Sequence, residues 1–425
     1  ERANAIVEDT ISALKAANLG EYEGFGVDLN GKLDLLNLVF IGHSRGSAGV
    51  FYAAKALADD QSVNVTGMLH IAPTDIIAED ITALQIPTAI VVPELDGDVI
   101  SLDGLTYFDL LVSQQDIGHD VQLVYLYGAN HNAFNEAVLP QDLGKIWYTG
   151  DRTTIPAAEQ RNFLEKYALA FADSVTTGTP LYEIGNSFAD NLFGARAIVS
   201  NRMSGSNRLF LAHDDSVTAS RADVEKVISS SMMNKNTAGL FSPGGFSQSL
   251  ELLKISWEEK GAYVDFALGE TMQPLSKTGK LSLYLAQDST SDLNNKQNQS
   301  FRIELADRAG NVAWFLLDSN TPALAYHSGH PIFEGDIFSS ITPLGIVDVP
   351  ISQFNQIDSI DITDVQNVRL NFSENSSGSI MVRAMFDSIA VETPEIKAPP
   401  AAIAVFVLLI LGALIFIFVF FRKRR

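Results

Sequence analysis

The sequence predicts a chain of three parts: a parallel α/β sheet, then an all-β sandwich, then a transmembrane helix. Short apolar runs alternate with helix-length segments in the first 200 residues, which is typical of a parallel sheet covered on both faces. After about residue 240, short alternating strands and turn residues predict an antiparallel sandwich. An uncharged apolar run near the C-terminus predicts a membrane-spanning helix.

Composition sets the limits on function. The chain has 425 residues, 46% of them hydrophobic and 19% charged, enough to bury a core in more than one domain. Lys and Arg total 29 and Asp and Glu 51, a formal charge of −22, which excludes nucleic acid as a partner. The absence of cysteine excludes disulfides, zinc-thiolate sites and cysteine nucleophiles. Because the sequence begins with Glu1, we expect a fragment or a processed form.

The first predicted domain, residues 1–200, alternates helices with apolar strands. An amphipathic helix over 3–18 ends at Asn18-Leu19-Gly20. Continuously apolar runs predict four strands, and the intervening segments have helical length. The strands are expected at 37–41, 66–71, 88–92 and 121–127, and the later helices at 48–58, 102–113 and 156–175.

The pattern of apolar and turn residues changes in the second half of the chain. Residues 201–245, rich in Ser, Asn and Gly, are predicted to connect the two domains, and 246–392 to form the sandwich. Aromatic side chains within it either fill the core or stack on sugar rings, so a carbohydrate is an expected partner. These side chains are Trp257, Tyr263, Tyr284 and Trp314.

The C-terminal end predicts topology. A Pro-containing spacer at 393–400 precedes the apolar run 401–421, whose 21 residues would span roughly 31 Å as a helix. The basic tail 422–425 stays on the cytoplasmic side, because Lys and Arg flank membrane spans there. We therefore expect a single-pass protein of the cell membrane with its domains outside the cytoplasm, either periplasmic or on the cell surface. The order of spacer, helix and basic end resembles bacterial exosortase-type sorting signals, although a simple anchor explains the same residues.

A candidate nucleophile lies directly after the first predicted strand. Gly42-His43-Ser44-Arg45-Gly46 fits the pattern G-x-S-x-G, and small residues follow it at the start of a helix. A strand, a cramped glycine turn and a helix form a nucleophile elbow, which exposes the serine hydroxyl. The pattern therefore predicts Ser44 as a nucleophile.

A nucleophilic serine needs a base, and the base needs an orienting carboxylate. Of the histidines that follow Ser44 in this domain, His131 comes after the strand 121–127, where ligands bind in open α/β sheets. The orienting acid is expected in the turn that follows the strand 88–92, where both Asp96 and Asp98 are candidates. We favour Asp96, because Val99 follows it at the usual spacing for this turn, and we keep Asp98 as the runner-up.

A metal site is the alternative use of these carboxylates. Asp96, Asp98 and Asp103 cluster in sequence, but their spacing does not match a calcium loop of the EF-hand type. The Ser-His-Asp mechanism needs no metal or organic cofactor, so none is expected.

Together these motifs resemble the α/β-hydrolase superfamily, near the dienelactone hydrolase and platelet-activating-factor acetylhydrolase branch of esterases. The resemblance covers about residues 1–180 and implies Ser44 as nucleophile, His131 as general base and Asp96 as its orienter. It also implies the backbone N–H of Arg45 as one oxyanion donor. Such domains begin with several strands before the elbow, so we expect the sheet to be incomplete at the N-terminus, with a second oxyanion donor upstream of Glu1. The fragment itself is then expected to be inactive if those strands are essential.

The sandwich resembles jelly-roll domains that accompany secreted bacterial enzymes. The function expected from all these features is a membrane-anchored serine hydrolase that cleaves carboxylic esters outside the cytoplasm, on a small-molecule, lipid or polymer substrate. Two alternatives stay open at this point. One is a non-catalytic surface binding or adhesion protein, and the other is a serine peptidase that uses the same triad.

Overall fold

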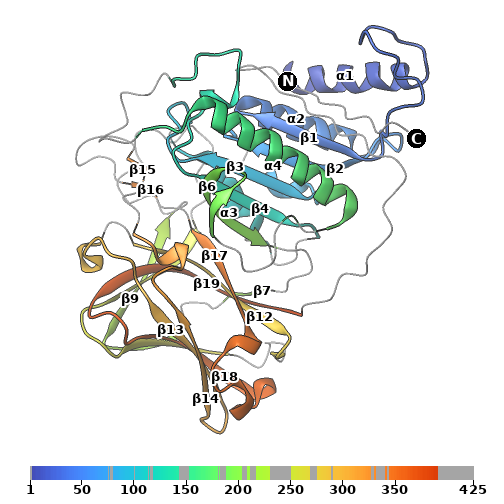
Figure 1. Ribbon diagram of the computed structural model, residues 1–425. Coiled ribbons are helices and arrows are strands. Elements are labelled where there is room, and N and C mark those ends of the chain that lie inside the picture. Colours follow the sequence, from blue (N-terminus) through green and yellow to red (C-terminus); the bar gives the residue numbers. More distant parts are fainter. Residues whose placement is uncertain are drawn as a thin grey trace.

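The computed structural model (Figure 1) shows a helix-covered sheet at one end of the molecule and a β-sandwich at the other. It describes residues 2–74, 76, 80–99, 101–112, 114, 118–142, 153–179, 181, 188–202, 208–210, 217–229, 250–268, 275–288, 291–326, 330–331, 340–341 and 344–390.

The first sheet has six strands in the order β1-β2-β3-β4-β6-β5. Strands β1 to β4 are parallel to their neighbours, whereas β6 pairs antiparallel with both β4 and β5. The four parallel strands are almost wholly buried, which explains why they are continuously apolar in sequence. The bounds are β1 Leu38–His43, β2 Val65–Ile71, β3 Thr88–Pro93, β4 Val121–Leu126, β5 Phe188–Leu192 and β6 Ala195–Arg202.

Helices cover both faces of this sheet, because successive strand residues point to opposite sides. On one face, Phe40 and Ile90 join a core with α1 (Arg2–Asn18), α2 (Arg45–Leu57) and α3 (Asp103–Val112). On the other face, Ile41 and Val91 pack with α4 (Ala157–Thr177). The carboxyl ends of the parallel strands are thereby left as the edge from which functional loops emerge.

Two further sheets pack face to face as a sandwich. One runs β17-β12-β19-β10-β9, with β7 paired to β19, and the other runs β14-β13-β18-β11-β8. The bounds of the first are β7 Arg208–Phe210, β9 Ala222–Ser229, β10 Leu250–Trp257, β12 Gly279–Gln287, β17 Gly345–Pro350 and β19 Gly378–Ala390. Those of the second are β8 Val217–Ser220, β11 Ala262–Ala267, β13 Phe301–Asp307, β14 Val312–Leu317 and β18 Val365–Phe372.

Shorter elements fill the connections. Strands β15 (His330–Pro331) and β16 (Ser340–Ile341) form a two-stranded pair. Single 3₁₀ turns occupy Ile81–Ala83, Asn132–Phe134, Asp292–Asn294, Pro322–Leu324, Ile351–Gln353, Ile357–Ser359 and Ile362–Asp364.

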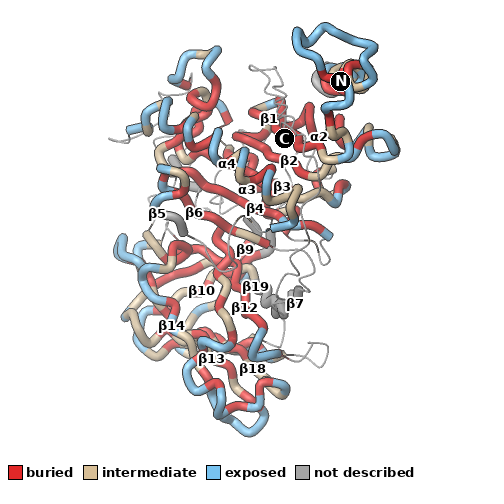
Figure 2. Tube along the Cα trace, turned by 45° about the vertical axis from the view of Figure 1, so that its right-hand side comes forward, coloured by how far each residue is buried: buried red, intermediate tan, exposed pale blue. Residues whose placement is uncertain are grey.

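The sandwich core lies between its two sheets, and strict alternation along each strand puts it there. In β18, Val368, Leu370 and Phe372 are fully buried, whereas the residues between them are only partly buried. Trp257 stacks on Phe372 with 4.1 Å between ring centroids. Figure 2 shows the buried residues running through both regions of the molecule.

The two regions meet through the outer face of the β12 sheet. The hydroxyl of Tyr284 on β12 hydrogen-bonds the buried carboxylate of Asp109 on α3, and Phe108 packs edge-on against the same tyrosine ring. The N–H of Ile346 on β17 donates to Ser200 Oγ on β6 at 3.2 Å. The β12–β17 part of this sheet is therefore covered on both sides, whereas the outer face of the β13 sheet is not part of this contact.

The predicted fold class was wrong for the chain as a whole. That class combined an α/β-hydrolase parallel sheet, a sandwich and a transmembrane helix. The described residues instead form mostly β-structure, with nineteen strands against four α-helices. Two of the six strands of the first sheet are antiparallel, and most strands lie in the sandwich, where alternating side chains favour pleated structure over helices.

The predicted localisation as a single-pass membrane protein is also wrong by this structure. Within the part of the chain that is described, no helix has both the length and the apolar character needed to cross a bilayer. The apolar run 401–421, the spacer 393–400 and the basic tail 422–425, on which the prediction depended, lie outside the described residues. The ranges 1–200, 201–245 and 246–392 stay predictions as domain boundaries.

Candidate functional site

Ser44 occupies a strained turn between β1 and α2. Its φ is 55° and its ψ −130°, in a region that residues other than glycine rarely adopt and that costs about 1–3 kcal/mol. The turn is tight as well: a Cβ on Gly42 would lie 2.6 Å from the backbone of Gly46 and Ser47. This explains the glycine at position 42, and it places a partly exposed serine at the carboxyl edge of the sheet.

Two loops at the same edge bring a carboxylate to a histidine. Asp96 follows β3 and His131 follows β4, the neighbouring strand. Nδ1 of His131 lies 3.0 Å from Oδ2 of Asp96, and both side chains are almost fully buried. The other oxygen of Asp96 accepts the backbone N–H groups of Asp98 at 2.9 Å and Val99 at 2.6 Å. The carboxylate is therefore fixed with one oxygen directed at the imidazole.

Burial and charge act against each other on this pair. Burial by itself raises the pKa of Asp96, but the nearby His131 and the N–H donors hold that pKa below its ordinary value. Burial lowers the pKa of His131, but the charge of Asp96 and its hydrogen bond hold that pKa above its ordinary value. Each partner thus stabilises the ionised form of the other, as a base and its orienting acid require.

His43, the residue before Ser44, lies against His131. Their ring centroids are 4.6 Å apart, and Nε2 of His43 lies 3.1 Å from the backbone oxygen of His131. Because burial lowers the pKa of His43 to about 3, its ring is neutral, and Nε2 donates to that oxygen. The histidine loop is thereby bound directly to the residue beside the candidate nucleophile.

The structure thus places each residue predicted for the site. Ser44, His131 and Asp96 all follow the carboxyl ends of parallel strands, and Arg45 is the first residue of α2. Asp98 is exposed, and Asp96 is the residue that accepts the hydrogen bond from the imidazole. No cluster of three or more His, Asp or Glu side chains suited to a metal ion occurs among the residues described.

Sequence reasoning missed two buried residues that hold the histidine loop. Gln160 on α4 exchanges hydrogen bonds with the backbone of Asn130, at 3.1 and 2.6 Å. The carboxylate of Asp142 accepts the backbone N–H groups of His131 and Asn132, at 2.9 and 2.8 Å. No motif in the sequence marks either residue, because both reach the loop from other segments of the chain.

A second candidate site is the free face of the β14-β13-β18-β11-β8 sheet, at the end of the molecule far from the helices (Figure 1). Its side chains alternate with the core residues, so they form a band of rings and polar groups across four strands. We call this band the outer sheet face, and its members are Tyr263, Asp265, Arg302, Glu304, Trp314, Arg369 and Asn371.

Ion pairs hold the outer sheet face in one arrangement. Arg369 forms two hydrogen bonds with Asp265, at 2.7 and 2.8 Å, and Asn371 donates to Glu304 at 2.8 Å. The guanidinium of Arg369 also lies 3.9 Å from the centre of the Tyr263 ring. These contacts link neighbouring strands, so the ring and the polar groups are oriented before any ligand arrives.

A second pair of an arginine and an aromatic ring lies on β13 and β14 of the same face. Arg302 lies 4.6 Å from the centre of the Trp314 ring and contacts Glu374 at 2.8 Å. Trp314 and Tyr263 are both partly exposed, whereas Trp257 and Tyr284 are buried. Of the four aromatic residues for which the sequence left a core or a sugar-binding role open, Trp257 therefore lies in the sandwich core, Tyr284 is buried in the contact between the two regions, and the other two lie on the outer sheet face.

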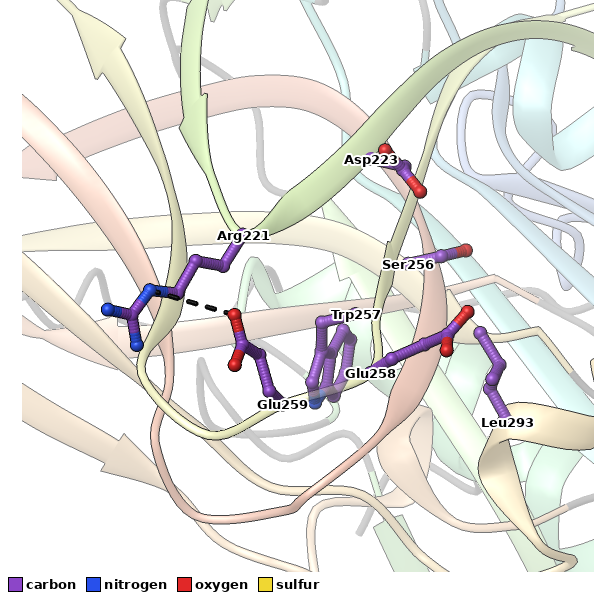
Figure 3. Close-up of a pocket in the computed structure, with 7 residues that line it drawn as sticks. All are labelled: Arg221, Asp223, Ser256, Trp257, Glu258, Glu259 and Leu293. Carbon is purple, nitrogen blue, oxygen red and sulfur yellow. Dashed lines mark ion pairs between the residues drawn. The ribbon is translucent and has the colours of Figure 1, made fainter.

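A cavity of about 360 Å³ lies beside the β8–β9 and β10–β11 turns (Figure 3). Its volume suits a small ligand, but charged side chains dominate its walls. Arg221 pairs with Glu259 at 3.7 Å, and Trp257 offers no free ring because it is 2% exposed and stacked on Phe372. The remaining lining residues are Asp223, Ser256, Glu258 and Leu293. The outer sheet face is therefore the better binding surface.

No protein-family model matches the chain, and a search of curated proteins gives no match. Among solved structures, an exo-β-agarase is similar at 12% identity and a TM-score of 0.26, over 45% of this chain and 25% of the agarase. The family 11 carbohydrate-binding module of a Clostridium thermocellum cellulase is similar at 11% identity and a TM-score of 0.27, over 45% of this chain and 98% of the module. A family 30 carbohydrate-binding module from a cellulase of the same organism is similar at 9% identity and a TM-score of 0.25, over 44% of this chain and 99% of the module. The match thus spans a quarter of the agarase and nearly all of each module.

Two predictions are corrected by the fold and by the family comparison. Assignment to the α/β-hydrolase superfamily was wrong: no family model supports it, and the described residues form mostly β-structure. The predicted function, a membrane-anchored extracytoplasmic serine hydrolase of carboxylic esters, was wrong with it. Since every TM-score is below 0.5, the proposals below rest on the chain's own residues.

Proposed function

We propose that the outer sheet face binds a neutral oligosaccharide. The observation that carries this proposal is the pairing of an aromatic ring with an oriented cation and carboxylate at Tyr263, Arg369 and Asp265. Aromatic faces accept the C–H groups of a sugar ring, and planar charged groups hydrogen-bond its hydroxyls. Arg369 already covers one face of the Tyr263 ring, so a sugar would contact the rest of that ring together with the polar groups beside it.

Charge and spacing narrow the class of ligand. The two arginines of the face and the carboxylates of Asp265, Glu304 and Glu374 nearly balance, which favours an uncharged ligand over a polyanion. Trp314 lies on β14 and Tyr263 on β11, three strand spacings apart, or about 14 Å. A ligand that contacts both rings must therefore contain several sugar units.

The test is affinity electrophoresis of the full chain in polyacrylamide gels that contain β-1,3-1,4-mixed-linked glucan, agarose or no glycan. These probes are chosen because one matched module was solved with a mixed-linked tetrasaccharide and a matched enzyme is an agarase. We expect at least one glycan to retard the wild-type chain. Trp314→Ala and Tyr263→Ala should each weaken retention at least tenfold, or about 1.4 kcal/mol.

A matched control is Tyr22→Ala, an exposed aromatic residue near α1 in the other region. It should leave retention unchanged. Equal retention of the wild type and both outer-face variants would contradict the proposal, as would a wild type that no neutral glycan retards.

We propose a second function for the region around Ser44: nucleophilic acyl transfer by Ser44, assisted by His131 and Asp96. The observations that favour it are the strained backbone of Ser44 and the buried contact between His131 and Asp96. Ser-His-Asp triads recur on unrelated folds and are recognised by geometry and role, so this proposal does not depend on the family of the chain.

The chemistry follows from these residues. Ser44 Oγ attacks an acyl carbonyl carbon while His131 Nε2 accepts the hydroxyl proton, and Asp96 stabilises the imidazolium that forms. The Arg45 N–H at the start of α2 would donate to the oxyanion. His131 then protonates the leaving group, and water repeats the cycle on the acyl-enzyme to restore Ser44.

The test is covalent labelling of the full chain by a fluorescent fluorophosphonate at pH 7 to 8. Labelling should disappear in Ser44→Ala and persist in Ser62→Ala, which changes an exposed serine of the same region. A folded wild type that takes up no label would reject the catalytic role and leave oligosaccharide binding as the proposed function.

A further inference from the structure

Asp142 binds two loops of the candidate catalytic site with one carboxylate. Its Oδ2 accepts the backbone N–H of Gly97 at 2.7 Å and the backbone N–H of His131 at 2.9 Å. Gly97 directly follows Asp96, and His131 is the histidine that Asp96 contacts. A single oxygen atom thus joins the acid loop to the histidine loop.

The second oxygen of Asp142 completes the attachment. Oδ1 accepts the backbone N–H of Asn132 at 2.8 Å and the side-chain amide of Asn130 at 2.9 Å. Asp142 is 5% exposed, so the four hydrogen bonds are made in a buried environment, where unpaired polar groups are costly. The three residues from Asn130 to Asn132 are therefore held together from one point.

The placement of this carboxylate has an electrostatic cost. Burial raises the pKa of Asp142, and the charge of Asp96 acts in the same direction, whereas the N–H donors oppose them. A second carboxylate beside a buried acid is unfavourable unless it is well bonded. The four donors meet that requirement, and they leave Asp96 free to bind the imidazole.

From this geometry we infer that Asp142 is a positioning residue for the proposed catalytic triad. It fixes the distance between Asp96 and His131 by holding the backbone next to each of them. It has no direct role in the reaction, and its function rests on the proposed activity of Ser44.

The experiment compares Asp142→Ala and Asp142→Asn with the full wild-type chain by fluorophosphonate labelling. A displacement of about 1 Å in a catalytic geometry costs about 10²-fold in rate, so Asp142→Ala should slow the maximal labelling rate by that factor with little change in probe affinity. Asp142→Asn keeps one accepting oxygen and should recover part of the loss.

Asp307→Ala is the matched control, because Asp307 also holds a turn by three hydrogen bonds, from Asn311 and Asp361, in the sandwich. It should lower stability without slowing the labelling of Ser44. If Asp142→Ala proves unfolded, Asn130→Ala removes one of the four hydrogen bonds and should slow labelling by a smaller factor.

A second measurement separates this inference from the activity. The Nδ1–H proton of His131, bonded to Asp96, should give a far-downfield NMR resonance that is absent in His131→Ala. In Asp142→Ala we expect that resonance to move or broaden. An unchanged resonance and an unchanged labelling rate would reject Asp142 as a positioning residue, whereas an unlabelled wild type with a shifted resonance would reject only the catalytic proposal.

Discussion

The region around Ser44 and the outer sheet face use polar side chains in opposite ways. Asp96 and His131 are buried, and their pKa values move away from the ordinary ones because burial and the partner charge act on them. On the outer sheet face, Arg369 and Asp265 are only partly buried and form their pair beside solvent. A few buried groups that shift each other's pKa values suit catalysis. A wide band of weak, oriented contacts suits reversible binding.

The largest effect that would sharpen this comparison is expected from Asp96→Asn. An amide in this position no longer stabilises the imidazolium of His131, so labelling of Ser44 should slow by about 10⁴-fold. Rates are measured with the fluorophosphonate, and circular dichroism checks that the variant is folded. Retention by glycan gels should be unchanged, because the outer sheet face is not altered. A rate within tenfold of the wild type would argue against an Asp96–His131 couple.

Trp257→Ala tests whether the sandwich core supports the outer sheet face. The ring is buried and stacked on Phe372, so its loss should cost about 3–5 kcal/mol of unfolding free energy. Urea unfolding followed by circular dichroism measures the loss. Trp314→Ala, at the partly exposed tryptophan, should cost much less. Similar losses for both variants would mean that the two tryptophans do not divide into core and surface roles.

Tyr284→Phe tests the contact between the two regions. It removes the hydroxyl that bonds the buried carboxylate of Asp109, and we expect a loss of about 1–3 kcal/mol. If this interface makes the two regions unfold together, calorimetry should show one thermal transition for the wild type and two for the variant. An unaltered unfolding profile would show that the hydroxyl contributes little to coupling.

The pH dependence of labelling gives the smallest effect, about tenfold per pH unit over the rising part of the profile. His131 must be neutral to accept the proton, and its pKa lies above the ordinary 6.5. Labelling should therefore rise with pH to a midpoint above 6.5 and then level off. In Asp96→Asn the negative charge that raises the pKa of His131 is lost, so the midpoint should fall below that of the wild type. A wild-type midpoint below 6.5 would contradict the assignment of His131.

The sequence predicted local elements well. Continuous apolar runs located β1 to β4, and helical spacing located α1 and α4, because burial on both faces of a sheet leaves a local signal. The short strands β8 and β9 lie inside the range 201–245, predicted as a connection, because several of their side chains are exposed and carry no apolar pattern.

The candidate sites were partly predictable for the same reason. Ser44 and His131 stand at recognisable strand ends, and the structure brings Asp96 rather than Asp98 to the imidazole. Asp142 could not be predicted, since its partners become neighbours only after the chain folds. The band formed by Arg302, Glu304 and Arg369 depends on strand register, which a single sequence does not reveal.

Strand β18 shows how the outer sheet face relates to the core. Val368, Leu370 and Phe372 point inward, and Asn367, Arg369 and Asn371 alternate with them on the other side. Because the strand lies between β13 and β11, its backbone position is fixed from both sides. The outward positions can therefore be substituted without touching the packed interior, and a library randomised at those positions alone should retain the sandwich fold.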